Sequence, residues 1–84
     1  MYDQATTQTA PHGETPEHSF ELGMMYSTGQ SVPLDMVSAH KWFNIAAKLG
    51  NEAAMRLRNE VAGEMSEREI AAAQRAARDW LTRH

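Results

Sequence analysis

The sequence contains no cysteine. Disulfide bonds and thiolate metal sites are therefore excluded, so neither can compensate for the small core that 84 residues allow. A domain of about 60 residues buries only about 60% of the surface that its unfolded chain exposes, so its net stability is small. Association with a partner or with a second copy would add to that stability.

Basic residues are missing from the first part of the chain, where Lys41 is the first to occur. No positively charged segment leads into an apolar run, and no apolar run approaches the length of a membrane span, so we expect a cytoplasmic protein without a signal peptide or membrane helix. The formal net charge is -3. Nucleic-acid binders usually carry a strongly basic face, because contacts with phosphates supply much of their affinity, and we therefore expect no nucleic-acid partner.

The usual arrangements of catalytic residues are also missing, including the GxSxG nucleophile motif and any glycine-rich phosphate loop. His12 and His18 stand near Glu14 and Glu17, in a polar segment where ligands without supporting hydrogen bonds would hold a metal poorly. His40 is expected to be exposed or to lie at an interface. We therefore expect no enzyme activity, no cofactor and no bound metal.

The hydrophobic pattern that is present predicts an all-α fold, a short α-α superhelix of about four antiparallel helices. Residues 1–16 are mostly polar and cannot bury enough surface to offset the entropy of ordering, so they are predicted to form a flexible tail. The helices are predicted over residues 17–28, 36–49, 51–62 and 67–82.

Residues typical of helix ends separate these segments. Gly29 and Gly50 follow the first two helices, where glycine can adopt the left-handed conformation of a C-cap. Asp35 precedes the second helix as an N-cap whose carboxylate can accept hydrogen bonds from free backbone amides. Ser66 and Glu69 have the spacing of a capping box at the start of the last helix.

Small residues predict close contact between the first two helices. Gly23 lies beside the inward stripe of the first helix and would let the second helix approach closely, which explains a residue of poor helix propensity. On the second helix, Trp42 shares a stripe with Ala39 and Ala46, whose small side chains leave a slot for an indole. We therefore predict that Trp42 packs in the core, in preference to serving as a platform for a stacked ligand.

A second set of apolar side chains has no obvious cover. Phe20 and Met24 lie one turn apart on the opposite side of the first helix, and Met36 and Phe43 form a shoulder on the second. The tail, a second copy or another protein could cover them. We predict that these four residues contribute to a partner-binding surface.

Small, aromatic and turn-forming residues follow one another in the order that a helix-turn-helix unit requires. In this respect the chain resembles the Sel-one-like repeat, a relative of the tetratricopeptide class. Residues 17–54 correspond to one complete repeat. Residues 55–84 would form a degenerate second unit, in which Arg58 and Val61 replace glycine and tyrosine, with a C-terminal capping helix. Ser31 stands where a second loop glycine is usual. The positions in register are Leu22, Gly23, Tyr26, Gly29, Val32, Asp35, Ala39, Trp42, Ala46, Ala47, Gly50 and Ala54.

The resemblance implies a protein-interaction module, an adaptor or regulatory scaffold that binds another protein or its own copy. The first alternative is a small helical regulator associated with nucleic acid through Arg68, Arg75, Arg78 and Arg83 of the last helix. Nucleic-acid binding would be strongest at low ionic strength, and this salt dependence would distinguish such a regulator from a protein-interaction module. The second alternative is an enzyme with an unrecognised cleft.

Overall fold

A computed structural model describes residues 15–83, and over this range the protein consists of four α-helices without strands. They are α1 (Pro16–Thr28), α2 (Met36–Lys48), α3 (Glu52–Ala62) and α4 (Glu67–Arg83). The predicted all-α fold is confirmed. Most of the predicted tail, residues 1–14, lies outside the described part of the chain.

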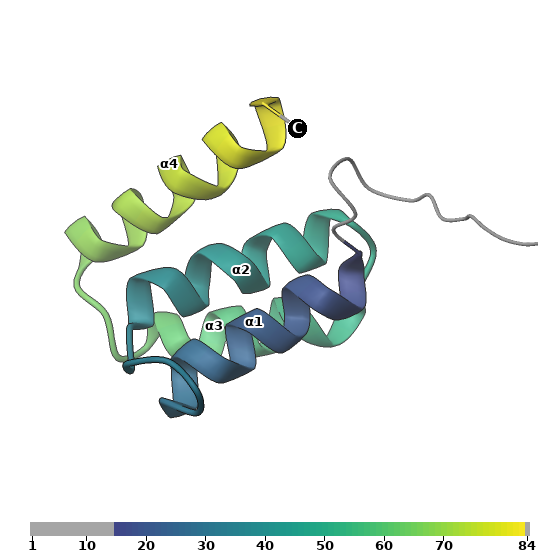
Figure 1. Ribbon diagram of the computed structural model, residues 1–84. Coiled ribbons are helices and arrows are strands. Elements are labelled where there is room, and N and C mark those ends of the chain that lie inside the picture. The colour runs from purple at the N-terminus through teal and green to yellow at the C-terminus, as the bar shows by residue number, and fades with distance from the viewer. Residues whose placement is uncertain (1–14, 84) are drawn as a thin grey trace, which may run out of the picture.

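Helix α2 is the centre of the structure, since α1, α3 and α4 all pack against it. The three outer helices make few contacts with one another. Figure 1 shows α4 on one side of α2 and α1 on the other, with α3 behind. Helices α3 and α4 are therefore joined mainly through α2. Among the described residues, no helix is both long and apolar enough to cross a membrane.

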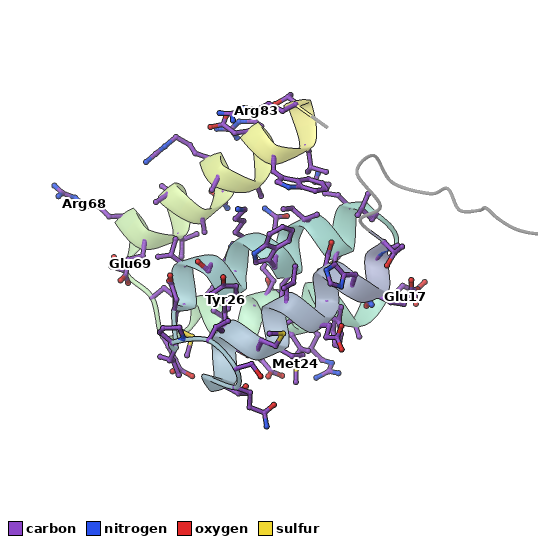
Figure 2. All side chains as sticks on the ribbon, viewed as in Figure 1. Glu17, Met24, Tyr26, Arg68, Glu69 and Arg83 are labelled. Carbon is purple, nitrogen blue, oxygen red and sulfur yellow. The ribbon has the colours of Figure 1, made fainter. Side chains whose placement is uncertain are left out.

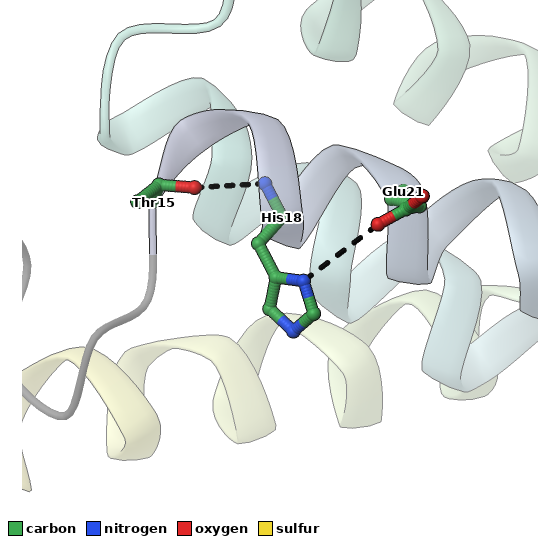
Figure 3. A network of polar contacts seen from close by, with 3 residues as sticks. All are labelled: Thr15, His18 and Glu21. Carbon is green, nitrogen blue, oxygen red and sulfur yellow. Dashed lines mark hydrogen bonds and ion pairs between the residues drawn. The ribbon is translucent and has the colours of Figure 1, made fainter.

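Each helix starts with a side chain that accepts a hydrogen bond from a free backbone amide. Thr15 Oγ1 accepts from the His18 amide at 2.9 Å, as Figure 3 shows. Asp35 Oδ1 accepts from the Ser38 amide at 3.1 Å, and Asn51 Oδ1 from the Ala54 amide at 3.1 Å. The predicted Asp35 cap is confirmed, whereas the caps at Thr15 and Asn51 were not predicted.

The predicted capping box at the start of α4 is confirmed, with both of its reciprocal hydrogen bonds. The Ser66 amide donates to Glu69 Oε1 at 2.8 Å, and the Glu69 amide donates to Ser66 Oγ at 3.1 Å. These bonds satisfy backbone groups that the first turn of a helix leaves free. The start of α4 is thus determined by its local sequence.

Left-handed residues end the first two helices as predicted. Gly29 has φ 76° and its amide donates to Met25 O at 2.8 Å, while Gly50 has φ 113°. Ser31 also has a positive φ, 69°, at the position where the resemblance to the repeat leads us to expect glycine. A side chain in this conformation is strained, because Cβ approaches the neighbouring backbone.

The core lies between α1, α2 and α3. Its buried residues come mainly from α2, where Ala39 and Ala46 are fully buried and Phe43 is 1% exposed. A Cβ on Gly23 would lie only 2.5 Å from Phe43 Cδ1, so the absence of a side chain at Gly23 allows this ring to pack directly against α1. The close approach predicted at Gly23 is confirmed, with Phe43 as the partner.

Trp42 does not occupy the slot predicted for it between Ala39 and Ala46. Phe43 fills the space beside these alanines, and Trp42 is only partly buried. The Trp42 ring meets the edge of Trp80 on α4, with centroids 5.7 Å apart and planes at 70°. The amino group of Lys41 lies 4.6 Å from the centroid of the Trp42 ring. Trp42 therefore helps to attach α4 to α2.

Candidate functional site

The four apolar residues predicted to bind a partner do not form one exposed surface. The prediction is wrong for Phe43, whose ring is buried against α1. Phe20 turns toward it, with ring centroids 5.7 Å apart, and Met36 also packs against the core cluster. Met24 remains 38% exposed, on the side of α1 turned away from α4 (Figure 2).

An open groove lies instead between α2, α3 and α4. Its volume is about 530 Å³, within the roughly 300–1,000 Å³ typical of ligand-binding clefts. The groove occupies the space between α3 and α4, which contact each other little although both pack on α2. The weak contact between α3 and α4 thus leaves side chains of three helices facing a common space.

Three cationic side chains line this groove, one from each helix. They are Lys48 of α2, Arg58 of α3 and Arg78 of α4. Arg58 is half-buried, and within the described part of the chain it hydrogen-bonds only to neutral amides, those of Asn44 at 3.5 Å and Asn59 at 3.3 Å and 3.4 Å. Among the residues that line the groove, none is acidic. The positive charge of the groove is therefore not balanced by any residue that lines it.

The other lining residues are neutral. Asn44, Gln74 and Thr82 provide amide and hydroxyl groups, while Ala77 and Leu81 provide apolar surface. The Thr82 hydroxyl donates to Arg78 O at 2.7 Å, so its own oxygen remains able to accept a hydrogen bond. The lining residues include no aromatic side chain. The groove thus combines cations, neutral hydrogen-bonding groups and a small apolar floor.

His40 is buried, which contradicts the prediction of an exposed or interface histidine. It is 2% exposed, and its Nδ1 has no hydrogen-bond partner within residues 15–83. Burial lowers the pKa of His40 below its ordinary value, and the positive charge of Arg58 lowers this pKa further. Burial and the charge of Arg58 therefore both favour the neutral form of His40.

The arginines considered for nucleic-acid binding differ in position. Arg68, Arg75, Arg78 and Arg83 are all exposed, but only Arg78 lines the groove. Figure 2 shows Arg68 and Arg83 extending from opposite ends of α4, away from the other helices. Exposed acidic residues of the same helix, Glu67 among them, reduce the positive charge of this surface.

A metal site requires several ligand side chains close together. Over residues 15–83, no group of three or more His, Asp or Glu side chains is placed to hold a metal ion. His18 Nδ1 lies 3.7 Å from Glu21 Oε1, an exposed pair on α1 (Figure 3). His12 and Glu14 lie outside the described residues.

The groove itself was not predicted from the sequence. One signal for it was present, because Arg58 stands where the resemblance to the repeat leads one to expect glycine. Gly23 allows α1 to contact α2 closely. The side chain of Arg58, in contrast, lines the groove between α3 and α4.

Comparison with known proteins does not assign the chain to a family. No family model matches it, and no curated protein or solved structure is significantly similar to it.

Proposed function

We propose that the protein is a helical protein-interaction module of the Sel-one-like repeat type, which binds part of another protein in the groove between α2, α3 and α4. The observation that carries the proposal is the groove, where cationic, amide and apolar groups of three helices face a common volume of about 530 Å³. Clefts that combine apolar surface with a few convergent polar groups are typical binding sites.

Features of the first repeat unit also support the proposal. Gly23 permits helix contact, and Gly29 and Asp35 end one helix and start the next. Ala39 and Ala54 are fully buried, as small residues at helix contacts should be. These residues build a scaffold and leave the chemistry of the surface to positions outside the repeat pattern.

The interaction surface differs from the one expected from apolar residues alone. Phe43 is needed in the core and cannot serve a partner. The exposed large apolar side chains are Met24 of α1, Leu34 of the following loop and Met55 of α3, which are 38%, 59% and 52% exposed. Single exposed apolar residues are common on protein surfaces, so the groove is the better binding site.

Site-directed photo-crosslinking in the native cell tests this function. Benzoylphenylalanine replaces Gln74, which is exposed in the groove, or Gln30, an exposed glutamine of the loop after α1 that serves as the matched control. We expect one defined protein adduct from position 74 and none from position 30. Equal adducts from both positions, or no protein adduct from either, would contradict the proposal.

A further inference from the structure

We infer that the groove recognises an acidic segment of a partner protein, whose carboxylates bind between Lys48, Arg58 and Arg78. The inference rests on the proposed function and adds the chemical class of the partner. Its first support is charge, since each of the three helices that form the groove contributes one cation and none of the lining residues is acidic.

The three cations have no carboxylate partner within the described residues. The ion pairs of this range, His18 with Glu21 and Arg56 with Glu60, lie elsewhere. Arg58 donates only to the neutral oxygens of Asn44 and Asn59, at 3.3–3.5 Å, which is long for a hydrogen bond. A carboxylate would replace these weak contacts with shorter, charge-assisted bonds and could accept two of them from one guanidinium.

The neutral groups fit the backbone and side chains of a peptide. The amides of Asn44 and Gln74 can both donate and accept, as recognition of peptide N–H and C=O groups requires. The half-buried Leu81 provides apolar surface for a side chain next to the acids. An isolated inorganic anion would use neither feature.

Nucleic acid fits the groove less well. Single-stranded binders gain affinity by stacking bases on aromatic rings, and no aromatic side chain lines this groove. The rings of Trp42 and Trp80 do not line the groove and contact each other edge to face between α2 and α4.

Titration of the intact protein with a defined peptide tests the inference. The probe is the acetylated and amidated peptide Glu-Glu-Leu-Glu-Glu-Leu, and its control has glutamine in place of every glutamate. Binding is measured by isothermal calorimetry at low ionic strength, where attraction between exposed charges is least screened. We expect the acidic peptide to bind and the glutamine peptide to bind at least tenfold more weakly.

Charge-neutralising variants locate the site. We expect about twofold to fivefold weaker binding for the exposed Lys48→Gln or Arg78→Gln, and about tenfold for the half-buried Arg58→Gln. Arg68→Gln and Arg75→Gln remove the same charge from α4 outside the groove and should change affinity less than twofold. Circular dichroism verifies that each variant folds, and Arg78→Glu, at an exposed position, supplies a stronger effect if Arg58→Gln is unstable.

Three outcomes would overturn the inference. The acidic peptide fails to bind, the glutamine peptide binds equally well, or Arg68→Gln weakens binding as much as Arg78→Gln. Tighter binding of a single-stranded oligonucleotide with the same dependence on Arg78 would instead assign the groove to nucleic acid. Self-association that Arg78→Glu abolishes would assign it to a second copy.

Failure of this inference remains distinguishable from failure of the proposed function. A protein adduct at position 74, together with no binding of the acidic peptide, would keep the interaction module and reject only the acidic partner. Absence of any protein adduct would reject the module itself.

Discussion

Replacement of Gly23 by alanine tests the closest contact between α1 and α2. A Cβ at this position would lie 2.5 Å from Cδ1 and 2.6 Å from Cε1 of Phe43. Nonbonded carbon atoms settle at about 3.5–4.0 Å, so relief requires about 1 Å of movement. The Phe43 ring is 1% exposed and has Phe20 beside it, with centroids 5.7 Å apart. Because the ring has no free space to enter, α1 itself has to shift.

Two opposing terms determine the magnitude. Overpacking of a well-packed core costs about 1–3 kcal/mol. Alanine also favours the interior of a helix over glycine by about 1 kcal/mol. Since a shift of α1 loosens the whole interface with α2, we expect overpacking to exceed the gain in propensity. Gly23→Ala should lower the free energy of unfolding by about 1–2 kcal/mol, and each kcal/mol lowers Tm by roughly 4–8 °C in a domain of 60–100 residues.

Urea unfolding followed by circular dichroism measures this effect. The control is a double-mutant cycle with Phe43→Leu, which replaces the ring that the new methyl group would meet. If the ring causes the cost, alanine at Gly23 should be less harmful in that background, with a coupling energy of about 1 kcal/mol or more. The reasoning is refuted if Gly23→Ala stabilises the wild-type protein, because helix propensity would then act without a steric penalty.

Three further changes test other parts of the structure. Ser31→Gly should stabilise the protein by about 0.5–1 kcal/mol, because φ is 69° there, and an unchanged Tm would contradict strain at this residue. Ser66→Ala should cost about 1 kcal/mol by removing the acceptor for the Glu69 amide, whereas Glu67→Gln, outside the capping box, should change urea stability little. The pKa of His40 is lowered in the folded protein, so the unfolded chain takes up a proton first as the pH falls. The free energy of unfolding should therefore decrease as the pH falls from the unfolded pKa of 6.5 to the lower folded pKa, and it should not depend on His40 above this range. His40→Gln should remove this part of the pH dependence of unfolding, and an unchanged profile would show that His40 does not cause it.

Local sequence predicted the helices well, because their limits depend on residues within a few positions of each end. Gly29 could be predicted from its freedom to adopt a positive φ, and Asp35 from its ability to accept from the Ser38 amide. The capping box of Ser66 and Glu69 also acts within a single turn. None of these interactions requires knowledge of the other helices.

The choice between neighbouring aromatic residues could not be made from one helix. Trp42 and Phe43 follow Ala39 by three and four residues, so both lie next to the same inward stripe. The position of Gly23 on α1 favours Phe43, because the ring fills the space that the missing side chain leaves. Trp42 then meets Trp80 of α4, which is distant in the sequence. The burial of His40 likewise depends on packing against other helices.

By itself the sequence determined four helices, the caps at Asp35 and Ser66 and the need for a close contact at Gly23, because each of these is encoded in the conformation and size of residues that are near neighbours in the chain. Only the tertiary structure decided that Phe43 enters the core and that α4 packs on α2 with little contact to α3. That arrangement leaves Lys48, Arg58 and Arg78 around one groove. Their proximity is a property of helix packing, since residues on three different helices share no local pattern that would bring them together.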